Sequence, residues 1–199
     1  MWFSSQLKEW RCLAQNFRSR SARRRRPEYG PIIEALECRT LLTAYAAATA
    51  AQLVADIKAA NTSGGVNTIT LTAATASPYV LSAVDNKTDG PTGLPVIGKK
   101  DNLTIIGNGD TIERSSAAGT PAFRLFDMAG GASLTLQNVT LQDGLASGLG
   151  ASAEGGAIFN QGTLILSGVT VQNNTAEVSG FGGASGAGGG IWSNGSLTL

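Results

Sequence analysis

The fold is decided by residues 155–176, which read GGAIFNQGTLILSGVTVQNNTA. Three short apolar runs, at 157–159, 163–166 and 169–171, are separated by the turn-forming sequences Asn-Gln-Gly and Ser-Gly. Each run is too short for a helix and is rich in β-branched residues, which favours strands. Asn and Gly at the junctions tolerate the backbone conformations of tight turns. The stretch therefore predicts strand, turn, strand, turn, strand.

This unit recurs along the chain with a period of about 30 residues. Residues 133–143 align without a gap with residues 163–173, and residues 188–199 repeat the first half of the unit. A triplet with apolar residues at its first and third positions begins in each repeat at Leu103, Leu134, Leu164 and Leu197. A fixed period of this length is typical of solenoids, in which each repeat is one coil.

Alternation within each run indicates which side chains face the interior. Leu164, Leu166, Val169 and Val171 occupy positions that can point into a coil, whereas Thr170 can point outward. One coil cannot bury such an apolar face by itself, but stacked coils share a continuous core. The pattern predicts a parallel β-helix.

Two elements of the repeat resemble the GGAI and FxxN halves of the polymorphic outer-membrane protein repeat. Residues 155–158 match the first half, and Gly189, Gly190 and Ile191 match it again. In the second half Asn174 matches the Asn while Val171 replaces the Phe, and the preceding coil has Leu141 and Gly144 there. The resemblance covers residues 123–199. It implies an all-β fold, a right-handed parallel β-helix of a bacterial surface protein.

Charge divides the chain into two parts. Residues 1–44 carry nine Lys or Arg and four Asp or Glu, whereas residues 45–199 carry six and ten. The run Arg23 to Arg26 suits nucleic acid, anionic lipid or the positive region of an export leader. Residues 36–44 resemble the LEPR-XLL motif of large bacterial surface proteins, with Cys38 in place of the Pro. We therefore predict that residues 1–48 are a basic export segment, disordered or cleaved.

A small-x-small site for cleavage of that segment is Ala44-Tyr45-Ala46. No run reaches the about 18 apolar residues of a membrane helix. Residues 49–199 form the predicted β-helix. Its first element is a short amphipathic helix over 49–61, with Thr49 as N-cap and with Leu53, Val54, Ile57 and Ala60 on one face. We expect this helix to cover the first coil.

The other end of the predicted solenoid has no second cap. The chain stops at Leu199 within a strand, which predicts a β-helix truncated there or able to associate through its uncapped last coil. The turn 107–110, Gly-Asn-Gly-Asp, is expected to be of type I′. Later coils carry glycine-rich detours, expected to be long loops.

Catalytic chemistry has little support in the sequence. There is no histidine, and both cysteines, Cys12 and Cys38, lie in the basic segment. The acidic residues of the repeat region are expected to stand singly at turns or in loops, rather than converging as glycan-cleaving enzymes require. They are Asp85, Asp89, Asp101, Asp110, Glu113, Asp127, Asp143, Glu154 and Glu177. We predict no enzyme, no catalytic residue, no cofactor and no metal site.

Two features suggest a binding surface. Thr70, Thr104, Thr135 and Thr198 recur on the outward side of the repeated strand, and Phe181 and Trp192 stand beside glycines where they could stack on a sugar. The acidic repeat region argues against nucleic acid.

The sequence thus predicts a cell-surface or secreted protein, extracellular or at the outer membrane, with a structural or adhesive role. Its expected partner is a surface polysaccharide or a protein of a host or neighbouring cell. The alternative is the N-terminal part of a carbohydrate-active β-helix enzyme, a lyase or hydrolase, whose catalytic coils are missing from this chain.

Overall fold

The computed structural model of the chain describes residues 42–74, 77–148, 153–178 and 186–199. Several predicted features lie outside the described residues: the basic run, both cysteines, most of the LEPR-XLL-like motif and Phe181. The described residues belong to one compact unit that spans residues 39–199.

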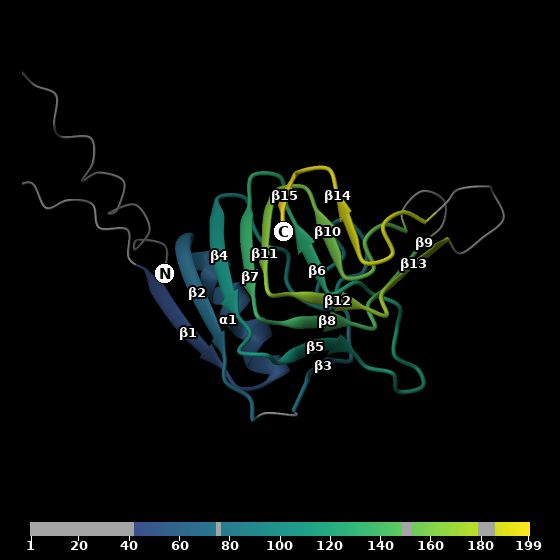
Figure 1. Cartoon of the computed structure of the whole chain (residues 1–199), viewed down its shortest axis with the longest axis horizontal. Coiled ribbons are helices and arrows are strands. Elements are labelled where there is room, and N and C mark those ends of the chain that lie inside the picture. Colours follow the sequence, from purple (N-terminus) through teal and green to yellow (C-terminus); the bar gives the residue numbers. More distant parts are fainter. Residues whose placement is uncertain (1–41, 75–76, 149–152, 179–185) are drawn as a thin grey trace, which may run out of the picture. The chain divides into compact units, whose positions relative to one another are not determined.

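The described unit is a parallel β-solenoid of about four turns with one helix (Figure 1). Its largest sheet has six strands, in the order β1 (Thr43–Ala47), β2 (Gly65–Leu71), β4 (Asp101–Ile106), β7 (Ser133–Gln137), β11 (Thr163–Ser167) and β15 (Ser196–Thr198). The prediction of a parallel all-β solenoid is confirmed, and its right-handedness remains a prediction.

Three smaller sheets complete the coils. One contains β3 (Tyr79–Leu81), β5 (Thr111–Arg114), β8 (Thr140–Gln142) and β12 (Thr170–Gln172). Another contains β6 (Phe126–Met128), β10 (Ile158–Asn160) and β14 (Ile191–Ser193), and the last pairs β9 (Leu145–Gly148) with β13 (Thr175–Val178). All of these strand pairs are parallel.

The repeated leucines Leu103, Leu134 and Leu164 are buried in the interior, as the alternation predicts, whereas Leu197 is exposed. Leu103, Leu134, Leu164 and Leu197 are register partners in successive coils. Leu164 and Leu166 are buried, Val169 and Val171 are half-buried against the core, and Thr170 is exposed. Stacking in register places the buried leucines of neighbouring coils in one column, so burial of Leu103, Leu134 and Leu164 holds these coils together.

The Gly-Gly pair is required by the close approach of neighbouring coils. A Cβ atom on Gly156 would lie 2.3 Å from the Gly189 carbonyl oxygen and 2.4 Å from that of Thr175. Gly155 has a φ of 64°, which glycine adopts without strain. The backbone N–H of Gly156 donates to the Gly189 carbonyl at 3.0 Å, so the two glycine pairs lie directly against each other.

Asn174 joins its coil to the preceding one through its amide. Its Oδ1 accepts from the Gly144 backbone N–H at 2.9 Å, and its Nδ2 donates to the Leu141 carbonyl at 3.0 Å. The Leu141 carbonyl and the Gly144 N–H of this half-buried turn are therefore both paired with one side chain. This accounts physically for the Asn in the second half of the repeat.

The predicted capping helix is present as α1 (Ala50–Ser63). The Thr49 hydroxyl accepts from the Gln52 N–H at 3.2 Å, and Gly64 ends the helix with a φ of 60°. Its buried residues Leu53, Ile57 and Ala60 join the hydrophobic core. The helix packs against β1, β2, β3 and β4 and covers the first coil.

Strand β1 lies inside the segment predicted to be disordered or cleaved. It pairs with β2 over all five of its residues. Ala47 is fully buried, and its carbonyl accepts from the Thr72 N–H at 2.8 Å and from the Tyr79 hydroxyl at 2.6 Å. Strand β1, which precedes residue 49, is therefore part of the folded unit, and cleavage at Ala44-Tyr45-Ala46 would remove most of this strand.

Candidate functional site

The outward face of the sheet formed by β3, β5, β8 and β12 carries a polar ladder. Glu113, Gln142 and Gln172 are register partners on three neighbouring strands. Gln142 Nε2 donates to Glu113 Oε2 at 2.6 Å, and Gln172 Nε2 donates to Gln142 Oε1 at 2.8 Å. A row of threonines runs two residues away, at Thr111, Thr140 and Thr170. The face repeats hydrogen-bonding groups at the spacing of the strands.

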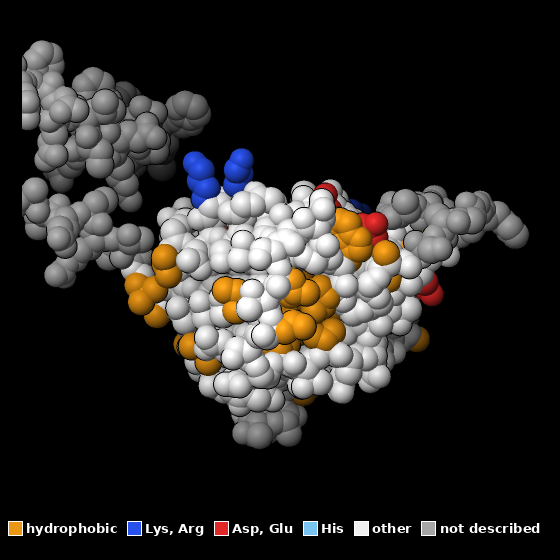
Figure 2. All heavy atoms as spheres, turned by 45° about the horizontal axis from the view of Figure 1, so that its top comes forward, with side chains coloured by type: hydrophobic (Ala, Val, Ile, Leu, Met, Phe, Trp, Pro, Cys, Tyr) orange, Lys and Arg blue, Asp and Glu red, His pale blue; other side chains and the backbone are white. Residues whose placement is uncertain are grey.

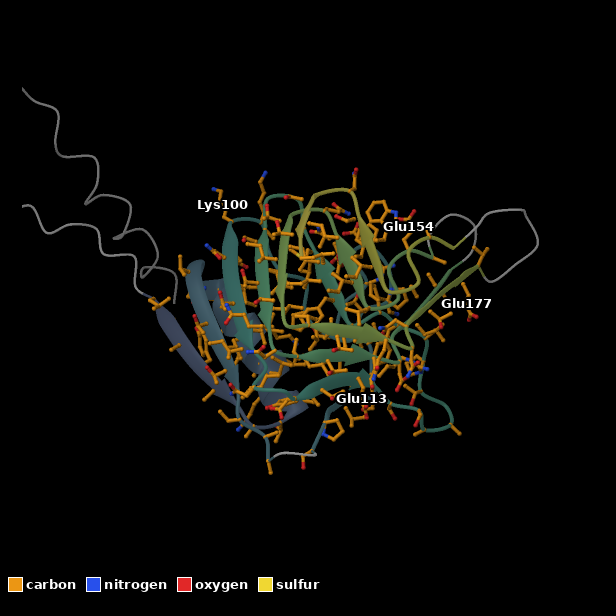
Figure 3. All side chains as sticks on the ribbon, in the orientation of Figure 1. Lys100, Glu113, Glu154 and Glu177 are labelled. Atoms are coloured by element: carbon orange, nitrogen blue, oxygen red, sulfur yellow. The ribbon has the colours of Figure 1, made fainter. Side chains whose placement is uncertain are left out.

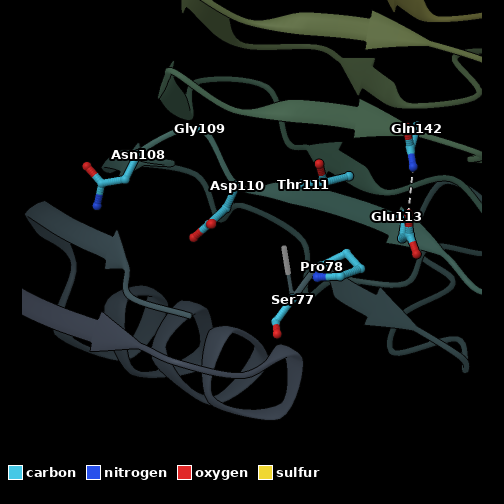
Figure 4. A pocket seen from close by; sticks show the side chains of 8 residues that line it. All are labelled: Ser77, Pro78, Asn108, Gly109, Asp110, Thr111, Glu113 and Gln142. Atoms are coloured by element: carbon cyan, nitrogen blue, oxygen red, sulfur yellow. Dashed lines mark hydrogen bonds between the residues drawn. The ribbon is translucent and has the colours of Figure 1, made fainter. Parts of the chain in front are cut away.

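A hollow of about 410 Å³ lies at one end of this ladder (Figure 4). Its polar lining consists of Ser77, Asn108, Asp110, Thr111, Glu113 and Gln142, and Pro78 and Gly109 complete it. Figure 4 shows Asp110 on one side of the hollow, and Glu113 with its hydrogen-bonded partner Gln142 on the other.

The turn between β4 and β5 positions part of this lining. Asn108 and Gly109 have φ values of 53° and 89°, and the Asp110 N–H donates to the Gly107 carbonyl at 2.8 Å. Positive φ at both central residues is the mark of a type I′ turn, so that prediction is confirmed. Asn108 Nδ2 also donates to the Leu71 carbonyl at 2.9 Å, which fixes its side chain against the preceding coil.

The hollow corrects the prediction that the carboxylates stand singly. Asp110 and Glu113, which are three residues apart in the chain, line the same hollow. The type I′ turn ends at Asp110 and β5 begins directly after it, so both residues reach the outer side of the same corner. Turn type combined with strand alternation is the sequence signal that could have found the pair.

One member of the threonine row predicted on the six-stranded sheet is wrong. Thr68, not Thr70, is the register partner of Thr104, which in turn pairs with Thr135. Thr70 lies beside Ile106 instead. Ile165 and then Thr198 continue the row, so an isoleucine interrupts the threonines on β11.

A second polar group lies on the sheet of β6, β10 and β14, and it is enclosed. Arg124 is 2 % exposed and Asp127 is fully buried. Among the described residues, neither oxygen of the Asp127 carboxylate has a hydrogen-bond partner in good geometry, and Nε and Nη1 of Arg124 also lack one. The segment after β3 covers them, because the Arg124 N–H donates to the Pro91 carbonyl and the Ile97 N–H donates to that of Asp127.

Burial dominates the electrostatics of this pair. The pKa of Asp127 is raised to about 6, chiefly by desolvation and then by the charge of Asp89, while Arg124 and the backbone N–H of Asp89 oppose both. Burial likewise lowers the pKa of Arg124, while Asp127, Asp89 and Glu154 act in the opposite direction. Because Arg124 and Asp127 are both buried, a ligand in solvent cannot reach them, and we interpret the pair as a structural contact inside the protein.

An aromatic stack adjoins the buried arginine. The Arg124 guanidinium lies 4.7 Å from the centre of the Phe159 ring, and Phe159 stacks on Trp192 with ring centres 4.5 Å apart and planes 5° apart. One face of the Trp192 ring is therefore covered by Phe159. The stack joins three successive coils through a cation–π contact and a π–π contact.

Other acidic residues do not converge on the hollow. Figure 3 shows Glu113, Glu154 and Glu177 apart from one another, with Lys100 at a different edge of the unit. Within the described ranges, no group of three acidic side chains is arranged to hold a metal ion. In the same ranges no helix has the length and apolarity needed to cross a membrane.

Comparison of the chain with protein-family models, with curated proteins and with solved structures finds no match. The fold is therefore established from the chain's own geometry as a parallel β-solenoid, and the relationship to polymorphic outer-membrane proteins remains a resemblance of short motifs.

Proposed function

We propose that this protein is a secreted or cell-surface β-helix with an adhesive role, and that it binds a neutral polysaccharide along the face of β3, β5, β8 and β12. The observation that carries the proposal is the in-register ladder of Glu113, Gln142 and Gln172 beside the polar hollow. A repeating polymer suits a surface that repeats the same groups on successive strands.

The chemistry of the lining selects the class of ligand. Carboxylates, amides and hydroxyls accept and donate hydrogen bonds in combinations that match sugar hydroxyl groups. Asp110 and Glu113 carry negative charge, and none of the residues lining the hollow is Lys or Arg. An anionic polymer would meet like charge there, whereas a neutral one would not.

The test is binding of the purified chain to immobilised polysaccharides, with neutral glucans and mannans compared with polyuronates. Glu113→Ala removes an acceptor from both the ladder and the hollow, and it is expected to weaken retention on a neutral polymer at least tenfold. Thr135→Ala on the six-stranded sheet is the matched control and should bind like the wild type. Equal binding by both variants would refute the assignment of the site.

A second candidate function, distinct from an enzyme whose catalytic coils are missing from this chain, is cleavage of a polysaccharide at the same hollow. Asp110 and Glu113 form a pair of carboxylates, and hydrolysis of a glycosidic bond requires two such groups. The binding experiment separates the two functions if the polymer is recovered and its length measured. An adhesive protein leaves the chain length unchanged, whereas a hydrolase or lyase shortens it.

A further inference from the structure

The polar ladder of Glu113, Gln142 and Gln172 is continued by an apolar residue on β3. Val80 is the register partner of Glu113, so it occupies the next position of the same row. Its side chain neither donates nor accepts a hydrogen bond, and the residue is 41 % exposed. A polymer that follows the ladder from strand to strand therefore reaches an apolar position at β3.

A second hollow, of about 440 Å³, has Val80 in its wall and lies between the start of α1 and the segment that follows β3. We call it the apolar hollow. Its wall includes six side chains of Ala or Val, which are Ala50, Ala51, Val54, Val80, Ala83 and Val84. Among its described lining residues Asp85 alone is charged, and the Lys58 ammonium lies 2.6 Å from that carboxylate. The apolar hollow therefore presents no unpaired charge to a ligand.

A third hollow, also of about 440 Å³, connects the apolar hollow with the polar one. It shares Ser77 and Pro78 with the polar hollow. It shares Thr49, Ala50 and Val80 with the apolar hollow. Figure 4 shows Ser77 and Pro78 on the side of the polar hollow that is nearer to the helix. The three hollows therefore adjoin one another along β3 and the start of α1.

Exposed hydrophobic side chains do not identify a site by themselves. Figure 2 shows such side chains gathered in the middle of the face that it presents. The apolar hollow is distinguished by its concave shape and by its continuity with a hollow whose lining suits sugar hydroxyl groups. A concave wall removes a small apolar group from water on several sides. The ligand that fits both regions carries hydroxyl groups and apolar substituents on one chain.

The start of α1 adds hydrogen-bond donors to the apolar hollow. The N–H groups in the first turn of a helix have no intrahelical acceptor. Among the described residues no group accepts from the N–H of Ala50 or Ala51, and both residues line the apolar hollow. An acetyl ester matches this wall, because its methyl group packs on Ala and Val while its carbonyl oxygen accepts from an N–H. A carboxylate would also accept there, but the apolar wall would cost it its hydration.

From these observations we infer that the apolar hollow binds acetyl groups of an O-acetylated neutral polysaccharide whose backbone lies along the ladder. This inference rests on the proposed function and specifies the class of polymer within it. Burial of one methyl group is worth about fourfold in affinity. An acetylated polymer should therefore bind more tightly by at least that factor than the same polymer without its acetyl groups.

The experiment compares retention of the purified chain on an O-acetylated mannan and on the same mannan after removal of the acetyl groups by mild alkali. The wild type is expected to bind the acetylated form at least about fourfold more tightly. Ala51→Glu on α1 and Ala83→Glu on the segment after β3 each place a carboxylate in the apolar hollow, and each should bring the ratio of the two affinities to about one. Glutamate is favourable in the first turn of a helix, so Ala51→Glu should retain the stability of α1.

The matched control is Ala55→Glu, the same change at an exposed position one turn further along α1 and outside the lining of the apolar hollow. It should keep the wild-type ratio of affinities. Melting temperatures of the three variants check that each retains the fold. Loss of the ratio in Ala55→Glu, or its survival in both Ala51→Glu and Ala83→Glu, would overturn the inference.

Two results separate this inference from the proposed function. Equal retention of both mannans by the wild type, as expected if the apolar hollow held a peptide segment, would overturn the inference. Glu113→Ala would then still weaken retention on both polymers, and the proposed function would stand. Retention of neither mannan by the wild type would refute the proposed function and the inference together.

Discussion

Stability should depend on pH through the buried Asp127. Its pKa is raised to about 6 from an ordinary value of 3.8, mainly because burial disfavours the charged carboxylate. A group whose pKa is higher in the folded state holds its proton more tightly there than in the unfolded chain. The contribution of Asp127 to the free energy of unfolding is therefore fully present below the pKa of the unfolded state, and it is lost as pH rises through the pKa of the folded state.

The size of the effect follows from the two pKa values. A tenfold change in proton affinity is worth about 1.36 kcal/mol, so the rise in pKa from 3.8 to about 6 corresponds to about 3 kcal/mol. This is a sizeable part of the about 5 to 15 kcal/mol that stabilises a typical domain. We expect the free energy of unfolding contributed by Asp127 to fall by that order between pH 4 and pH 7.

Asp127→Asn isolates this contribution because the amide has the shape of the carboxylic acid and does not titrate. Urea unfolding of the wild type and the variant, measured from pH 4 to pH 8, gives the difference in their free energies of unfolding. That difference should change by about 3 kcal/mol in favour of Asn as pH rises. Leu164→Ala is the control: it destabilises without altering a titrating group, so its difference from the wild type should not vary with pH.

The reasoning fails if the difference between wild type and Asp127→Asn stays constant over this range. It also fails if the variant loses stability relative to the wild type at pH 7 and above. A constant difference would mean that attraction to Arg124 balances the desolvation of the carboxylate, and a loss of stability in the variant would mean that the attraction outweighs it.

Three further predictions concern the coils and the cap. Gly156→Ala places a methyl group within 2.4 Å of two carbonyl oxygens, so it should lower the yield of folded protein or its melting temperature. Gly130→Ala should have a far smaller effect, because the nearest atom to a Cβ there is 3.9 Å away. Equal melting temperatures of the two variants would contradict the close approach of the coils. Leu164→Ala should cost about 2 to 5 kcal/mol in urea unfolding, because Leu164 is fully buried in the leucine column; a cost below about 1 kcal/mol would show that the column is loosely packed. Thr49→Ala removes the N-cap of α1 and should cost about 1 kcal/mol, whereas Thr49→Ser should retain most of the stability; equal loss in both would exclude a capping role for the hydroxyl.

The sequence by itself determined the solenoid, the capping helix and the type I′ turn. Each of these features is specified by a local sequence pattern. A period of about 30 residues repeats the leucines, Thr49 and Gly64 bracket the apolar face of α1, and Asn108-Gly109 suits a positive φ. Strand β1 was less visible in the sequence, because four of its five residues are Thr or Ala and its place in the fold depends on pairing with β2.

Only the tertiary structure decided which polar residues meet. Asp110 and Glu113 share a hollow because a turn and a strand meet at one corner, and Arg124 and Asp127 are buried because the segment at 91–97 folds over them. The register that aligns Thr68 with Thr104 is likewise set by pairing between strands far apart in the sequence. Periodicity specifies the side of a strand on which a residue lies, but the residues beside it depend on how coils of unequal length stack.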